Sequence, residues 1–182
     1  MAELARQEEG FTLIEILIAV MLLTVAIMAV LSVLDSSRSL VSVSEKNQTA
    51  SHRAEQELER VAALPYSQIA LASAPTSSLD PSSPNYYVGP GNTYQWDPSD
   101  STKVENLRIA AGGVPPSTNW NDSQSRISGT TFDYVTDFYD PKLVSSPDQP
   151  DGRRITVAVT VNGKGLKKPV RTSTLVMDPS SP

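Results

Sequence analysis

The stretch Gly10-Phe11-Thr12-Leu13-Ile14-Glu15 opens an almost unbroken apolar run, and this run decides how the chain is built. From Phe11 to Leu34 the run holds 24 residues, of which only Glu15 has a strongly polar side chain. A helix of that length spans about 36 Å at about 1.5 Å per residue, enough to cross a hydrocarbon core about 30 Å thick. The sequence therefore predicts one membrane-spanning helix over residues 11–34.

Glu15 is the feature of this helix that needs a functional explanation. The fifteen Phe, Leu, Ile and Val residues of the run favour insertion by roughly 5 to 9 kcal/mol in sum. One carboxylate near a helix end opposes insertion by about 3 kcal/mol or less, so insertion still wins. An ionisable side chain inside a membrane segment needs a partner, and we expect a positively charged one.

The same six residues resemble the cleavage and methylation motif of type IV prepilins and type II secretion pseudopilins. The resemblance implies that a prepilin peptidase cuts after Gly10, that Phe11 becomes the N-methylated first residue, and that Glu15 is the fifth residue of the mature chain. It further implies that Glu15 pairs with the new α-amine, between neighbouring subunits or locally, during assembly. Partners would be other pilins, the peptidase and an inner-membrane assembly platform.

Composition bounds the remaining possibilities. The chain has 182 residues, no cysteine and a formal net charge of −5; residues 1–10 carry three glutamates and one arginine, so their removal changes −5 to −3. Mild acidity argues against nucleic acid as a partner, and the missing cysteines exclude disulfides and thiolate chemistry. No cofactor motif or catalytic constellation is visible, so we expect a structural subunit and no enzyme.

The chain divides by pattern into five segments. We expect a leader over residues 1–10, the membrane helix over 11–34, its extracytoplasmic continuation over 35–64, a Pro- and Ser-rich linker over 65–84, and a β-rich head over 85–182. The helix should be continuous, and Pro65 should end it. Its apolar stripe comprises Leu40, Val43, Ala50, Ala54, Leu58 and Val61.

The head is predicted from short β-branched and aromatic runs. The expected strands are 86–88, 94–96, 107–110, 131–138, 155–161 and 170–177, with 155–161 and 170–177 forming a hairpin beside 131–138. The predicted fold class is α+β, a long N-terminal helix with a small C-terminal antiparallel β-sheet head. Residues 53–66 are similar to the helix end of minor pilins, which favours a minor subunit over a major one.

Two side-chain clusters in the head suggest binding sites. Calcium prefers oxygen ligands, and five aspartates are close in sequence, although turns are the favoured explanation for them. They are Asp133, Asp137, Asp140, Asp148 and Asp151. Six basic residues, with no acid among them, would form a positive patch able to hold DNA phosphates, although a solvated hairpin end is the favoured explanation. They are Arg153, Arg154, Lys164, Lys167, Lys168 and Arg171. His52 is expected to be solvated on a polar helix face.

The sequence thus favours a pilin-like subunit of a type IV pilus or a type II secretion pseudopilus. We expect it first in the cytoplasmic membrane, spanning once with its head outside, and then in an extracellular pilus or a periplasmic pseudopilus. Two rivals stay open. One is a single-span surface adhesin or receptor that never polymerises, and the other is a DNA-binding competence pilin.

Overall fold

We describe a computed structural model of the chain, which covers residues 12–140, 150–163 and 168–179. The chain divides into two compact units, one ending at Ser42 and the other beginning at Val43. The helix α1, Leu13–Ala62, contributes residues to both units. Two short 3-10 helices follow it, at Tyr66–Gln68 and Pro84–Tyr87.

α1 is continuous, as predicted, and some of its hydroxyl groups form hydrogen bonds within the helix. The Thr24 hydroxyl donates to the carbonyl of Val20 at 2.7 Å, and the Ser36 hydroxyl donates to the carbonyl of Ser32 at 3.0 Å. Such bonds remove the cost of leaving a hydroxyl unpaired in an apolar environment. The helix ends at Ala62, two residues before the expected end at residue 64, and Pro65 follows.

The described residues of the second unit form seven strands in two antiparallel sheets. The smaller sheet has the order β1-β2-β3, with bounds Val88–Gly89, Thr93–Gln95 and Val104–Asn106. The larger sheet has the order β4-β5-β6-β7, with bounds Ser117–Asp122, Ile127–Phe138, Gly152–Val161 and Val170–Met177. Together with α1 they confirm the predicted α+β fold class.

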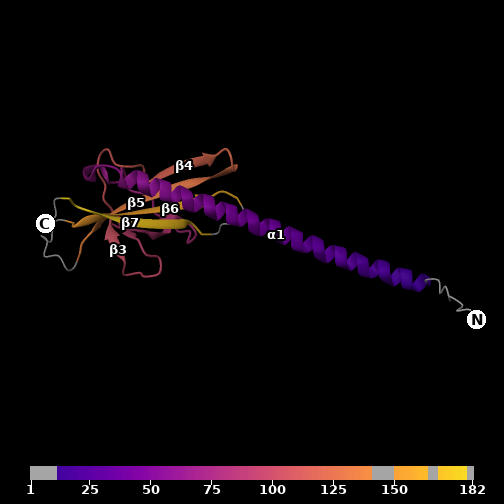
Figure 1. Ribbon diagram of the computed structural model, residues 1–182. Coiled ribbons are helices and arrows are strands. Elements are labelled where there is room, and N and C mark those ends of the chain that lie inside the picture. The colour runs from indigo at the N-terminus through magenta and orange to yellow at the C-terminus, as the bar shows by residue number, and fades with distance from the viewer. Residues whose placement is uncertain (1–11, 141–149, 164–167, 180–182) are drawn as a thin grey trace, which may run out of the picture. The chain divides into compact units, whose positions relative to one another are not determined.

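The larger sheet is covered on both faces within the second unit (Figure 1). On one face lies the C-terminal part of α1, whose buried Ala50, Ala54 and Val61 belong to the core with Val135 and Val157. On the other face the ring of Tyr134 in β5 stacks on Tyr94 in β2, with centroids 4.0 Å apart. Adjacent residues of β5 therefore point to opposite faces of the larger sheet, one toward α1 and the next toward the smaller sheet, as the two-residue period of a strand requires.

The structure differs from the predicted elements at three places. β4 was not predicted, residues 84–87 form a 3-10 helix where a strand was expected at 86–88, and β3 lies at 104–106 instead of 107–110. The start of the predicted linker also joins the head. Ile69, Ala70 and Leu71 are buried, and Leu71 bridges to Ile109 and Val114. An apolar triplet inside a Pro- and Ser-rich segment is enough to pull that segment into the core.

Candidate functional site

The first turn of α1 forms a helix cap around Glu15. The backbone N–H of Glu15 donates to the Thr12 carbonyl at 3.0 Å and lies 3.4 Å from the Thr12 hydroxyl oxygen. Thr12 and Glu15 have the Thr-x-x-Glu spacing of a capping box, and a carboxylate in a first turn is favoured by the helix dipole. This local role of Glu15 was not predicted from the sequence. Gly10 and Phe11 lie outside the described residues.

The surface around Glu15 is apolar and uncovered. A shallow hollow beside Glu15 is lined by Ile16, Ala19, Val20 and Leu23. Every large apolar side chain from Leu13 to Leu34 is at least half exposed, from 50% at Leu34 to 79% at Leu13. By length and composition, α1 is able to cross a membrane. So much exposed apolar surface in water would drive association, so the helix needs lipid or other helices around it.

Residues 5–31 match the family model of the prokaryotic N-terminal methylation motif. The chain carries the prepilin signature of type IV pilins and pseudopilins. The prepilin motif covers the residues before α1 and the first part of the helix, and it stops short of the head. No curated protein and no solved structure matches the chain significantly, so the head must be understood from its own geometry.

The prepilin motif marks a structural type of subunit that a prepilin peptidase processes and that assembles with other pilins. Together with the apolar helix it suggests membrane anchoring. The match spans Gly10, Phe11 and Glu15. The cleavage position, the methylated residue and the assembly role of Glu15 stay predictions at this point.

The aspartates of the head serve several separate structural purposes. The Asp151 carboxylate is buried and accepts a hydrogen bond from the backbone N–H of Asp140 at 2.7 Å. Asp137 is half-buried, and this burial raises the pKa of its carboxyl. Asp148 lies outside the described residues. The described part of the chain contains no group of three or more His, Cys, Asp or Glu side chains able to hold a metal, so it adds no support for the calcium hypothesis.

Asp133 faces the helix instead. Its side chain is fully buried in β5, where it meets Glu57 of α1, and Glu57 is paired with Arg60 in a short contact and with Arg53 at 4.0 Å. Burial raises the pKa of the Asp133 carboxyl to about 7, and the negative charge of Glu57 adds to the rise. A carboxyl in such a place is favoured in its protonated form.

The three arginines of the predicted basic patch are held against aromatic rings. The Arg154 guanidinium lies 3.8 Å from the centroid of the Trp96 ring and bonds Glu105 at 3.1 Å. Arg171 lies 4.2 Å over Tyr87, and its two terminal nitrogens are buried. Since Arg153 is also buried, the three described arginines contribute little exposed positive charge to the predicted patch.

Arg153 shows how such an arginine is used in the head. It donates to the carbonyl of Ile69 at 2.8 Å and, in a shorter contact, to that of Tyr66, and its guanidinium lies 4.2 Å over the Tyr66 ring. Arg153 therefore fixes the segment that follows α1 onto the sheet. Lys168 is exposed, whereas Lys164 and Lys167 lie outside the described residues.

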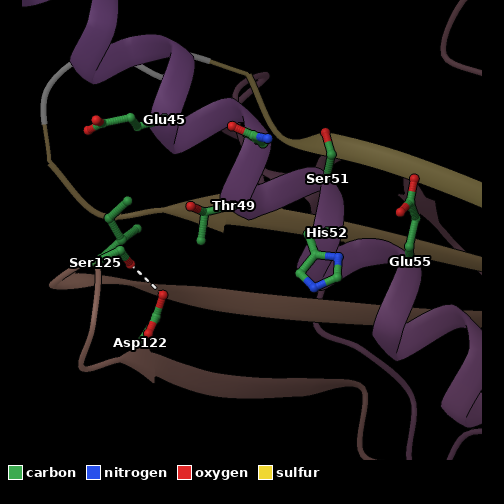
Figure 2. A pocket seen from close by; sticks show the side chains of 9 residues that line it. Glu45, Thr49, Ser51, His52, Glu55, Asp122 and Ser125 are labelled. Carbon is green, nitrogen blue, oxygen red and sulfur yellow. Dashed lines mark hydrogen bonds between the residues drawn. The ribbon is translucent and has the colours of Figure 1, made fainter.

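The head also has a polar groove that the sequence did not indicate. One flank of α1 and the β4–β5 turn line an open hollow of about 850 Å³. Figure 2 shows side chains that line it. Its lining from α1 includes Glu45, Thr49, His52 and Glu55, and a second hollow continues it along β4 past Asn119 and Trp120. His52 is exposed, as expected, and its Nε2 lies 3.1 Å from the Gln56 side-chain nitrogen.

Asp122 sits at the mouth of this groove as an ionised carboxylate. It accepts hydrogen bonds from the Ser125 hydroxyl and from the backbone N–H of Gln124, and these bonds lower its pKa. Figure 2 shows Asp122 and Ser125 opposite the helix residues Glu45 and Thr49. The groove is therefore lined mainly by acidic and uncharged polar side chains from segments far apart in the sequence, with Ile127, Trp120 and Arg53 beside them.

Proposed function

We propose that this chain is a pilin-like structural subunit that is cut after Gly10, methylated at Phe11 and assembled through α1. The single observation that carries the proposal is the prepilin motif on a helix whose large apolar side chains from Leu13 to Leu34 are all exposed. The prepilin motif alone would also fit a membrane-anchored precursor that does not assemble. A helix with this much uncovered apolar surface also supplies the cohesion of a helical bundle, because neighbouring helices remove that surface from water or lipid headgroups.

Glu15 sets the register of that assembly. Cleavage after Gly10 creates a positively charged α-amine on Phe11, and a carboxylate buried among helices is strongly destabilising unless a positive charge reaches it. Among the described residues, those that line the apolar hollow beside Glu15 include no positive charge. A neighbouring subunit that brings its amine to this position satisfies both charges, whereas a shifted neighbour satisfies neither.

We further propose a minor subunit of a type IV pilus or a type II secretion pseudopilus. The proposal rests on the similarity of residues 53–66 to the helix end of minor pilins and on the proline-rich head, which holds most of the fourteen prolines of the chain. The rival hypothesis, a single-span adhesin, differs from the pilin hypothesis because it expects no cleavage after Gly10. The competence pilin would need phosphate-binding cations, and Arg153, Arg154 and Arg171 are engaged within the head.

Mass spectrometry of the protein from its native membrane tests the proposal. We expect loss of residues 1–10 and an N-terminal Phe11 that carries one methyl group. A Gly10→Val variant should accumulate as the intact precursor, because a bulky side chain at the scissile position obstructs the peptidase. An intact Met1 in the unaltered protein would overturn the proposal and favour the adhesin.

Charge reversal tests the competence rival separately. Replacing Lys164, Lys167 and Lys168 with glutamate should leave DNA retention unchanged if the subunit is not a DNA receptor. A salt-sensitive retention that these changes abolish would support the rival instead, because phosphate contacts weaken steeply with added salt.

A further inference from the structure

The edge strand β4 carries unused backbone hydrogen-bonding groups. Within the described residues β4 pairs with β5 alone, and the order β4-β5-β6-β7 places it at the edge of the sheet. The Asp133 N–H donates to the Pro116 carbonyl at 3.1 Å, which makes this position a hydrogen-bonded pair of the ladder. Since bonded and non-bonded positions alternate, Ser117, Asn119 and Asn121 direct their N–H and C=O groups away from β5.

These outward groups are open to approach. The side chains of Ser117, Asn119 and Asn121 are all exposed, and no described strand lies beyond them. Natural edge strands are usually protected by lysine, proline, bulges or covering loops. β4 contains no lysine, arginine or proline, and its one charge, Asp122, stands at its end. A proline precedes each edge strand, Pro116 before β4 and Pro169 before β7, but only β7 contains a basic residue, Arg171.

The groove beside β4 has a definite charge. Three carboxylates line it, Glu45 and Glu55 from α1 and Asp122 from β4, against a single arginine. That arginine, Arg53, is directed toward Glu57 at 4.0 Å. Alternate side chains of a strand added to β4 would enter this groove, because the side chains of neighbouring strands stand on the same face. Basic side chains fit the carboxylates there.

We propose that β4 is a docking edge for an extended segment of a partner polypeptide with basic side chains at alternate positions. The proposal goes beyond helix-mediated assembly, since it uses the head and no residue of the prepilin motif. A polypeptide is favoured over a glycan or a nucleic acid because only a backbone presents N–H and C=O groups at the spacing of Ser117, Asn119 and Asn121. Main-chain bonds give affinity, and the acidic groove gives the preference for basic side chains.

The test uses the full chain in detergent micelles and a blocked seven-residue peptide in which lysine and threonine alternate. Hydrogen–deuterium exchange across residues 117–122 should slow about fivefold or more with saturating peptide, because amides in a ladder are protected. A peptide with glutamate in place of lysine should bind at least about tenfold more weakly, as expected for unpaired like charges. Equal binding of both peptides would overturn the basic specificity.

Matched variants separate the strand edge from the groove. Asn121→Pro removes one outward N–H without touching the bonds to β5, and it should weaken peptide binding about tenfold. Ser173→Pro removes an outward N–H from the exposed edge of β7 and should leave the affinity within about twofold. Glu55→Gln should weaken binding, whereas Glu59→Gln, outside the groove, should not.

Two results would overturn the proposal. One is unchanged exchange of the 117–122 segment at millimolar peptide. The other is binding that Glu55→Gln weakens and Asn121→Pro leaves intact, which would show attraction to the groove without strand addition. Cleavage and methylation of the Asn121→Pro variant should remain normal, so failure here is distinguishable from failure of the proposed function.

Discussion

Asp133 is a buried acid that couples the stability of the head to pH. Asp133 is fully buried against Glu57. Burial, reinforced by the charge of Glu57, raises its pKa from 3.8 to about 7. In the folded state this carboxyl therefore keeps its proton over a range where the unfolded chain has lost it.

The sign of the resulting pH dependence follows from linkage. Between pH 3.8 and about 7 the folded state binds more protons at Asp133 than the unfolded state, so this residue makes stability fall as the pH rises through that range. The loss is at most about 4 kcal/mol, at about 1.4 kcal/mol per unit. Asp133→Asn should abolish this decline and leave the head more stable than the unaltered protein at pH 8. Thermal unfolding followed by circular dichroism at pH 5, 7 and 8 measures it.

Asp97 provides the matched control for Asp133. It is solvent-accessible, and hydrogen bonds from Ser99 lower its pKa, so its own contribution is lost only as the pH falls through its acid range. Asp97→Asn should leave the slope between pH 5 and 8 unchanged. A stability curve of Asp133→Asn that still declines in parallel with the unaltered protein would contradict the prediction.

Glu15 combines a local role with an assembly role, and two substitutions separate them. Glu15→Gln keeps a polar N3 side chain for the helix cap and removes the charge, so it should be cleaved normally but enter filaments poorly. Thr12→Ala removes the cap, at about 1 kcal/mol, and keeps the charge, so it should still assemble. The measurement is the fraction of processed subunit that co-sediments with filaments. The opposite order of the two variants would assign Glu15 to capping alone.

At the scale of elements, two small residues let α1 approach the sheet. Ala50 and Ala54 are fully buried against the core, and they leave room for the β-branched side chains of β6. Ala54→Leu should destabilise the head by about 1 to 3 kcal/mol through overpacking. Ser44→Leu, on the same helix but exposed, should change the free energy of unfolding by less than about 0.5 kcal/mol. Denaturant unfolding compares them, and equal effects would contradict the packing argument.

The strands show which elements can be predicted from local sequence. β7 was predicted with its observed bounds, and β6 was recognised from alternating β-branched residues, although it begins earlier, at Gly152. The prediction that residues 131–138 lie beside the hairpin is confirmed, since β5 pairs with β6 and β6 pairs with β7. β4 has the composition of a loop, with Asn and Asp in half of its positions. It is a strand because β5 offers a partner and because the Trp120 ring packs over Gly129, and neither contact is visible in the segment itself.

The candidate sites, like the strands, differ in whether the local sequence is enough to predict them. The prepilin motif occupies consecutive residues, so the sequence alone predicts it. The groove joins residues 45–56 to residues 119–127, and it could not be predicted once β4 was taken for a loop. The positions of Arg154 and Arg171 depend on Trp96 and Tyr87, which approach them only when the smaller sheet covers the larger one. Charge counts along the sequence therefore overestimated the exposed positive charge.

At the scale of the whole molecule, burial differs sharply between the two units. The described residues bury none of the large apolar side chains from Leu13 to Leu34. The second unit, in contrast, has a continuous core. The buried helix residues Ala50, Ala54, Glu57 and Val61 all belong to the second unit. The stability of the head should then be independent of residues before Val43.

A pair of truncations tests this independence. A chain that begins at Val43 should be soluble without detergent, elute as a monomer and unfold within about 3 °C of the full chain in micelles, because it keeps every helix residue of the core. A chain that begins at Ala63 should aggregate, since losing Ala50, Ala54 and Val61 uncovers the face of β5 and β6 that they bury. Size-exclusion chromatography and circular dichroism distinguish the outcomes. If the Val43 chain also fails to fold, α1 would have to stabilise the head through its apolar half as well, and filament assembly and head folding would be one coupled process.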